Sequence, residues 1–184
     1  MFFAVACCEG RASRARRGAH TPKPKSPNAR GPDVTLSLRP NDPLDLEPLS
    51  SLLTDAADLS LVNPSAKHPF DPLEWMEKWL AEPDDASFYV LDEAGQEVGF
   101  FALRVGVGPE VRHLTYVYIA PEMRGGAGHA VTAMAEDMAR RLGARSLSLK
   151  VETDNAPALS VYQSAGYEEL SRRSGMATMR RDLD

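Results

Sequence analysis

The chain has 184 residues, 43% of them hydrophobic, and a formal net charge of −5 at pH 7. This length supports one domain with a sizeable core, and no apolar run approaches the ~20 residues that cross a membrane. The two cysteines, Cys7 and Cys8, are adjacent, which excludes a disulfide framework, and no Cys/His cluster has the spacing of a zinc site. We therefore expect a globular, cytoplasmic protein without a bound metal.

Residues 1–32 differ in composition from the rest of the chain. They hold seven basic residues, one acidic residue and four prolines, whereas the remainder carries 14 basic and 25 acidic residues. Such a segment cannot bury enough apolar surface to offset its chain entropy, so we predict a disordered extension before a domain at 33–184. A signal peptide is disfavoured, because the short apolar stretch precedes the charges. A phosphate-binding arm and a dispensable extension stay open, and we prefer the second.

The first third of the predicted domain contains one strand signal and two helix signals. Alternating hydrophobicity predicts a strand over 34–38, and apolar spacing predicts one helix over 44–59. A break with several prolines follows. Residues 71–74 then combine a capping residue, a proline in the first turn and a glutamate at the third position, which is a strong helix start. This second helix carries Trp75 and Trp79, one turn apart.

The rest of the domain alternates strands with helices. Three strand signals separated by short polar turns, which predict an antiparallel meander, lie at 87–91, 97–107 and 111–120. A helix over 128–142 leads into a strand over 146–151, which predicts a βαβ unit with a parallel strand pair. Segments 167–171 and 176–181 form a closing hairpin. The predicted fold is mixed α/β: a twisted, mostly antiparallel sheet with helices on both faces and one parallel βαβ unit.

The most informative motif spans 151–167 and joins a short strand to a helix. Asn155 can cap the helix, Pro157 stands in its first turn, and Gly166 ends it where a left-handed residue is needed. Tyr162 comes seven residues after Asn155, nearly two helical turns, so both side chains can point to one side. The pattern reads N-x-x-A-x-x-x-Y-x-x-x-G-Y.

A second motif spans 117–130, where a β-rich run ends at a proline and three glycines stand at a helix start. Glycines let the backbone approach a ligand closely, and free N–H groups at a helix start attract phosphate. A glycine-rich turn alone is weak evidence, because ordinary tight turns use the same residues. Two such motifs in this order, separated by one helix and one strand, are a strong signal.

Together the two motifs resemble the GCN5-related N-acetyltransferase (GNAT) family, in which the glycine turn, Gln/Arg-x-x-Gly-x-Gly/Ala, holds the pyrophosphate of acetyl-CoA. Here the match departs from the pattern. Counting from Arg124 puts Ala127 and His129 at the glycine positions. Placing Gly126 and Gly128 there instead moves the Gln/Arg position one residue before Arg124. We favour this second alignment, with a turn shortened by one residue, because the following helix then keeps its expected length.

The resemblance covers about 34–182 and implies an N-acetyltransferase that moves an acetyl group from acetyl-CoA, its co-substrate, to a primary amine. It implies cofactor contacts from the end of the first parallel strand, from the glycine turn and from the later helix start. The implied cofactor-binding residues are Tyr118, Ile119, Arg124, Gly125, Gly126, Ala127, Gly128, His129, Ala130 and Asn155. For Asn155 a plain helix cap is the alternative, and both roles can hold at once.

The same resemblance makes Tyr162 the general acid that donates a proton to the departing sulfur. The ordinary pKa of tyrosine, near 10, keeps it protonated at neutral pH, as an acid must be. A buried structural tyrosine is the alternative. The general base stays open among Glu152, Glu122 and His113, and some family members need none. Glu152 is nearest the expected place, whereas His113 is interpreted as a surface residue.

Substrate choice should come from the first third of the domain, where 63–70 and the two tryptophans are expected over the acceptor end of the cleft. We interpret Trp75 and Trp79 mainly as a buried helix face. The acidic balance of the domain fits a cationic amine on a small molecule or peptide, and it disfavours nucleic acid. No membrane partner is expected, and a homodimer stays open. The rival functions are a noncatalytic acyl-CoA-binding module, against which Tyr162 argues, and a nucleic-acid-associated protein.

Overall fold

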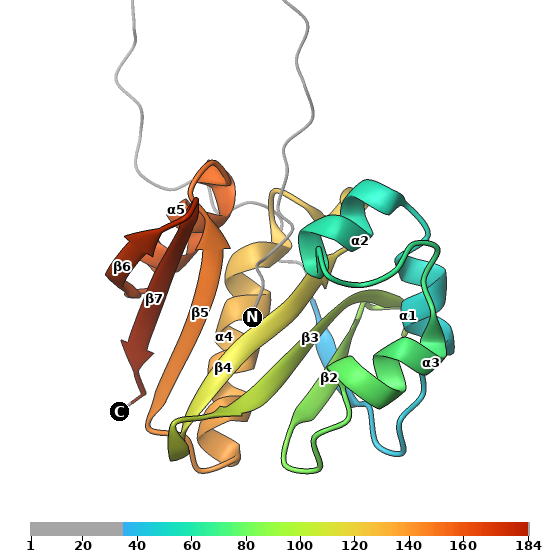
Figure 1. Cartoon of the computed structure of the whole chain (residues 1–184), viewed down its shortest axis with the longest axis horizontal. Coiled ribbons are helices and arrows are strands. Elements are labelled where there is room, and N and C mark those ends of the chain that lie inside the picture. The colour runs from blue at the N-terminus through green and yellow to red at the C-terminus, as the bar shows by residue number, and fades with distance from the viewer. Residues whose placement is uncertain (1–34, 184) are drawn as a thin grey trace, which may run out of the picture.

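A computed structural model describes residues 35–183, and the predicted extension at 1–32 lies outside the described residues. These residues form a seven-stranded sheet in the order β1-β2-β3-β4-β5-β7-β6 (Figure 1). The strands are β1 Ser37–Pro40, β2 Ala86–Leu91, β3 Glu97–Gly106, β4 Gly108–Ile119, β5 Ser146–Glu152, β6 Glu168–Arg173 and β7 Met176–Asp182. The β4–β5 pair is parallel and the other pairs are antiparallel. This arrangement confirms the predicted mixed α/β class.

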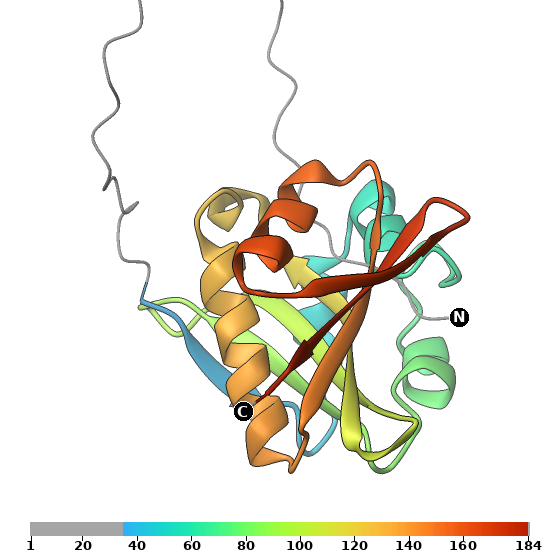
Figure 2. The same ribbon diagram turned by 90° about the vertical axis from the view of Figure 1, so that its left-hand side faces the viewer.

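Helices cover both faces of the sheet, as Figure 2 shows from the side. On one face, called the α4 face below, lie α4 (Ala127–Arg141) and α5 (Ala156–Ser164). The other, called the α2 face, carries α1 (Glu47–Leu52), α2 (Ala56–Val62), α3 (Pro72–Glu74) and the π-helical turn η1 (Trp75–Trp79). On the α2 face the helices cover β2 to β4, whereas β5 and β7 have no helix in front of them in Figure 1.

Alternation along the strands produces an apolar layer on each face. On the α2 face Trp75 is fully buried, stacks on Phe70 with ring centroids 5.3 Å apart, and meets Tyr116 edge-on at 5.2 Å. Trp79 is partly buried and also contacts Tyr116. The interpretation of both tryptophans as a helix face packed on the core is therefore confirmed. None of the described helices is long and apolar enough to cross a membrane.

The single helix predicted over 44–59 is wrong, because the structure divides this segment into α1 and α2. The division comes from Asp55, whose carboxylate accepts hydrogen bonds from the N–H groups of Ala57 and Asp58 at 2.8 and 3.1 Å. A residue capping in this way has extended backbone and begins a new helix, so α1 ends at Leu52. The apolar spacing continues across the break, so the spacing alone predicts one continuous helix and does not indicate the cap at Asp55.

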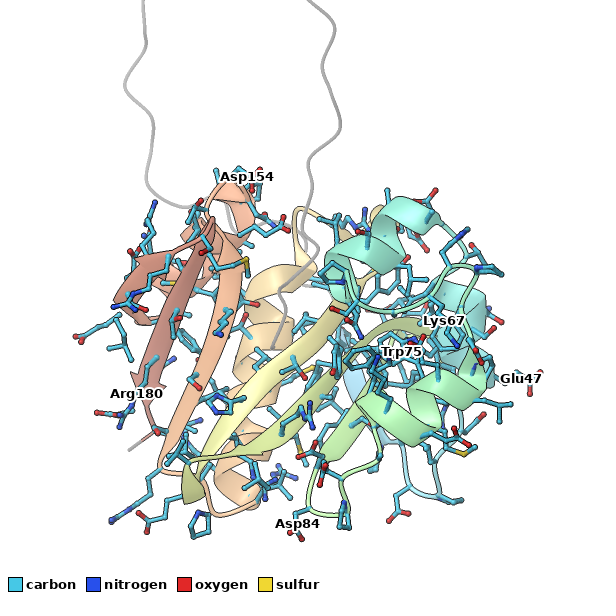
Figure 3. The ribbon with its side chains drawn as sticks, viewed as in Figure 1. Glu47, Lys67, Trp75, Asp84, Asp154 and Arg180 are labelled. Atoms are coloured by element: carbon cyan, nitrogen blue, oxygen red, sulfur yellow. The ribbon has the colours of Figure 1, made fainter. Side chains whose placement is uncertain are left out.

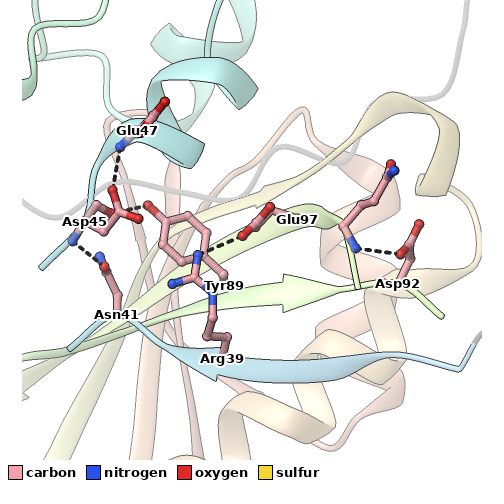
Figure 4. A network of polar contacts seen from close by, with 8 residues as sticks. Arg39, Asn41, Asp45, Glu47, Tyr89, Asp92 and Glu97 are labelled. Carbon is pink, nitrogen blue, oxygen red and sulfur yellow. Dashed lines mark hydrogen bonds and ion pairs between the residues drawn. The ribbon is translucent and has the colours of Figure 1, made fainter. Parts of the chain in front are cut away.

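A polar network attaches the chain before α1 to the edge of the sheet (Figure 4). The Tyr89 hydroxyl donates to the carbonyl of Asp45 at 2.6 Å, and the N–H of Asp45 donates to Asn41 at 2.8 Å. Arg39 of β1 donates to Glu97 of β3 at 2.8 Å across β2. Burial raises the pKa of Tyr89 well above its ordinary value, so its hydroxyl remains a donor. The network therefore fixes the position of α1 relative to β1 and β2.

Three other boundaries differ from the predicted ones. β1 begins at Ser37 rather than at 34 and includes Pro40, which an edge strand tolerates. β4 begins at Gly108, so the turn after β3 is shorter than predicted. The helix start at Asp71 is confirmed by its side-chain cap, but the helix continues as the π-helical turn η1. The short sequence pattern contained no signal for that widening.

Candidate active site

β4 and β5 pair over only part of their length. The ladder runs from Val111 opposite Ser146 to Leu114 opposite Leu149. β4 nevertheless continues to Ile119, and β5 continues to Glu152. The two parallel strands therefore diverge after Leu114, and the later backbone groups of β4 are not used in pairing with β5.

A β-bulge in β4 lies at the same point. The register with β3 shifts between Thr115 and Tyr118. Within the bulge Tyr116 has a φ of 52°, in the left-handed region that tyrosine rarely adopts. Thr115 and Tyr116 consequently both face the α2 side, where the Tyr116 ring packs against Trp75 and Trp79. Backbone strain of this kind persists where the surrounding packing enforces it, and it clusters at functional sites.

On the α4 face the diverging strand borders an apolar cleft. The cleft is lined by Leu114, Val117 and Ile119 of β4, by Gly128, Val131 and Thr132 of α4, and by Ala158, Val161 and Tyr162 of α5. Gly128 lets the two helices approach, because a Cβ on it would lie 3.2 Å from a methyl group of Val161. The cleft therefore runs between the end of β4 and the first turn of α4, with α5 as its third wall.

The turn before α4 presents backbone N–H groups at the end of this cleft. Gly126 is the N-cap residue of α4, and no side chain caps the helix. Gly125 has a φ of 92°, which suits glycine. The first N–H groups of this 15-residue helix are thus left for another acceptor. A helix start of this kind attracts an anion such as phosphate.

The side chain of Arg124 extends toward α2. Its Nε donates to the carbonyl of Ile119 at 2.8 Å, and its terminal nitrogen lies 2.8 Å from a carboxylate oxygen of Asp58. The Tyr118 hydroxyl also donates to Asp58, at 3.4 Å. Burial, together with the Asp58 carboxylate, raises the pKa of Tyr118 to about 12. Arg124 therefore connects the glycine turn to α2, and the side chain of Tyr118 lies on the α2 face.

Asn155 and Tyr162 both belong to α5 and both are buried. The side-chain oxygen of Asn155 accepts a hydrogen bond from the N–H of Ala158 at 3.2 Å, so the predicted helix cap is confirmed. Tyr162 is 2% exposed, lines the cleft and meets the ring of Tyr167 edge-on at 5.4 Å. Gly166 has a φ of 88°, as the predicted helix end requires.

The three candidate bases lie in different surroundings. Glu152 is the last residue of β5 and is half-buried, whereas Glu122 is exposed in the turn Pro121–Met123. His113 is not a surface residue as interpreted from the sequence, because it is half-buried and contacts the hydroxyl of Ser148 through Nδ1. Burial, and then the positive charges of Lys150 and Arg104, lower the pKa of His113. Its imidazole is therefore neutral at physiological pH.

The structure separates the predicted site residues into two groups. Ile119, Gly128 and Tyr162 line one cleft on the α4 face, and the glycine turn lies at its end. The side chains of Arg124 and Tyr118 are directed to the α2 face. His129 joins α4 to α5, with Nε2 2.7 Å from the hydroxyl of Ser164.

Sequence reasoning missed Thr115, Tyr116 and Lys150, which lie on the α2 face where the strands diverge. A shift of register inside a strand has no signal in the hydrophobic pattern. Over residues 35–183, no group of three or more His, Cys, Asp or Glu side chains is arranged to hold a metal ion.

Comparison with known proteins identifies the family. The profile of the family described as "Acetyltransferase (GNAT) family" matches residues 51–167. The chain therefore belongs to the GNAT family of acetyltransferases.

Several acetyltransferases share part of the sequence. An uncharacterized N-acetyltransferase of Methanocaldococcus jannaschii is 32% identical over 101 residues, which cover 52% of this chain and 45% of that protein. A mycothiol acetyltransferase of Renibacterium salmoninarum is 34% identical over 50% of this chain and 28% of its own length. An aminoglycoside N(6')-acetyltransferase type 1 of Stenotrophomonas maltophilia is 28% identical over 55% of this chain and 72% of its own. The chain thus spans less than half of the first two relatives.

Solved structures share the fold. Spermidine N-acetyltransferase from Vibrio cholerae, in complex with CoA and spermine, matches with a TM-score of 0.65 over 80% of this chain and 95% of that chain. A domain from Methanocaldococcus jannaschii matches with a TM-score of 0.67 over 82% of this chain and 100% of that one. The sequence identities are 20% and 14%, so these likenesses concern the fold alone.

Proposed function

We propose that the protein transfers an acetyl group from acetyl-CoA to a primary amine. The observation that carries the proposal is the apolar cleft that begins at the uncapped start of α4 and contains Tyr162. A thioester on a long arm with a phosphorylated end needs a narrow apolar channel next to an anion site. The cleft has both features, and they come from the two motifs that resemble the family.

The residues of this chain fit such a co-substrate along its length. The backbone of β4 after Leu114 is not paired with β5, so it is available to hydrogen-bond the amide groups of the arm. The N–H groups of Ala127, Gly128 and His129 suit the pyrophosphate. When bound, acetyl-CoA supplies an activated acetyl thioester. Arg124 would contribute through its tie to α2 rather than as a phosphate ligand.

The acceptor would come from the α2 face, through the gap between β4 and β5. An ammonium loses two protons as it becomes an amide. We assign the first to Glu152, directly or through a water molecule, because Glu152 ends β5 beside the gap. The amine nitrogen then bonds to the acyl carbon as the C–S bond breaks. Tyr162 donates its phenolic proton to the sulfur, and the second amine proton restores the phenol.

A matched pair of glycine variants tests the co-substrate site. Gly125 and Gly143 lie before and after α4, have φ values of 92° and 79°, and have open space where a Cβ would stand. Valine at either place costs similar backbone strain, but only Gly125→Val obstructs the helix start. We expect calorimetry to show acetyl-CoA affinity lowered at least about tenfold in Gly125→Val and unchanged in Gly143→Val. Equal affinities in the two variants would place the site elsewhere.

A further inference from the structure

Polar side chains flank the gap between β4 and β5 on the α2 face. The side chains of His113 and Ser148 contact each other across the two strands, so they share this face. Because side chains alternate along a strand, Thr115 and Lys150 return to the same face two residues later, immediately after the last ladder pair. Glu152 follows on β5 after two more residues. The side chains of Thr115, Lys150 and Glu152 therefore lie on the opposite side of the sheet from the apolar cleft.

The hydroxyl of Thr115 and the ammonium group of Lys150 have no hydrogen-bond or ion-pair partner within residues 35–183. Thr115 is 2% exposed, and its hydroxyl is buried without a hydrogen bond. The half-buried Lys150 makes no side-chain hydrogen bond or ion pair with the described residues, yet its charge lowers the pKa of His113. A buried polar group without a partner is costly, and such groups usually have a reason to be there. A cation and a hydroxyl placed in this way suit an anionic ligand.

Two neighbouring carboxylates on this face are already paired with arginines. Asp85 pairs with Arg104 at 2.7 Å, and Asp58 pairs with Arg124 at 2.8 Å. Glu152 makes no ion pair within the described part of the chain. β5 thus presents an ammonium group, Lys150, and a carboxylate, Glu152, on the same face, neither of them in an ion pair with the described residues. Their Cα atoms are about 7 Å apart. That separation matches a ligand with both charges, a few bonds from each other.

We propose that Lys150 and Thr115 bind an anionic group of the acceptor, so that the substrate is an amine with a carboxylate a few bonds from its reacting nitrogen, as in an amino acid. The assignment rests on the proposed acetyl transfer. The ammonium group faces Glu152, and the carboxylate faces Lys150. A polyamine would instead bring a second positive charge toward Lys150. The local charges therefore argue against the purely cationic acceptor expected from the acidic composition, because the charge beside the site decides binding.

The test compares acceptors in pairs, each an amino acid and its carboxamide, which share the amine but differ in the carboxylate. CoA release gives kcat/KM for both members, and their ratio measures the preference for the carboxylate. We expect the wild type to prefer the amino acid by about 10- to 100-fold, the range for a hydrogen bond to a charged group. In Lys150→Met the ratio should fall to near one, and in Lys150→Arg it should recover in part.

Arg180 supplies a matched control. Arg180 lies on β7 opposite Ser148 of β5, and because residues paired across two strands point to the same face, it shares this face. Its side chain, labelled in Figure 3, is exposed and already paired with Asp182 at 2.8 Å. Arg180→Met should keep the wild-type ratio. Equal kcat/KM values for the amino acid and its carboxamide in the wild type would overturn this assignment alone. A ratio that Lys150→Met leaves unchanged would do the same. Acetyl-CoA binding without acetylation of any acceptor would overturn the proposed function and the assignment with it.

Discussion

The two faces of β4 carry different kinds of side chain, although both belong to one strand. Toward α4 the strand presents the apolar side chains of Leu114, Val117 and Ile119, which line a narrow cleft. Toward α2 it presents Thr115 and Tyr116, among aromatic rings and ion pairs. Regular alternation would not put two consecutive side chains on one face, but the bulge at Tyr116 does. One strand can therefore separate a site for an apolar arm from a site for a polar acceptor, and the divergence from β5 connects them.

The largest effect is expected on the α4 face, from Tyr162→Phe. This change keeps the ring and its edge contact with Tyr167 but removes the proton donor. We expect the turnover rate to fall by about 10²–10⁴-fold, the usual contribution of a positioned acid. Melting temperature and acetyl-CoA affinity, measured as controls, should stay near the wild-type values. Full turnover in the folded variant would leave Tyr162 as a packing residue only.

The next largest effect concerns the connection between the two faces, the pair Arg124–Asp58. Both side chains are largely buried, with exposures of 12% and 14%. Removing one partner leaves a buried charge alone, so Asp58→Asn or Arg124→Met should each lower the free energy of unfolding by about 3–5 kcal/mol. The double variant should lose no more than the worse single one, because the cost is shared. Denaturant unfolding of all four proteins gives the coupling.

Phosphate binding is the alternative role for Arg124, and the same variants distinguish it from the ion pair with Asp58. If its guanidinium bound phosphate, Arg124→Met would weaken acetyl-CoA binding much more than Asp58→Asn would. A tie between the glycine turn and α2 predicts similar changes in the two variants. Additive losses of stability, together with a loss of affinity confined to Arg124→Met, would contradict the tie.

The smallest effect is a pH dependence on the α2 face. Burial, followed by the charges of Lys150 and Arg104, holds the pKa of His113 below its ordinary 6.5, whereas Asp85 acts in the opposite direction. The His113 imidazole therefore takes up a proton more readily in the unfolded chain than in the folded one. The contribution of neutral His113 to the free energy of unfolding is complete above about pH 6.5 and is lost as pH falls through the folded pKa. Lys150→Met should raise the pKa of His113 in an NMR titration of its ring. An unchanged titration would show that Lys150 does not face His113.

The sequence predicted the elements whose signals are local. The cap at Asn155, the helix end at Gly166 and the parallel pair around α4 each follow from residues close together in the chain. The division between α1 and α2 was also visible in principle, since Asp55 is a capping residue. The apolar spacing on either side outweighed that signal.

The features that shape the α2 side of the site depend on distant residues, and sequence patterns do not report them. The bulge at Tyr116 exists only in the register between β3 and β4. Arg124 meets Asp58 from a position 66 residues away in the chain, and Lys150 influences His113 across the strand pair. The family pattern pointed to Arg124 as a cofactor residue, whereas its contacts are with Ile119 and Asp58.

Hydrogen exchange in the presence and absence of acetyl-CoA tests the central claim, that the co-substrate occupies the α4 face, most directly. We expect the ligand to slow exchange of the backbone amides at 127–130, which start α4, and at 117–119, which end β4. Amides in α1 and α3, on the other face, should exchange at unchanged rates. Protection confined to the α2-face helices, with none at the start of α4, would contradict the account.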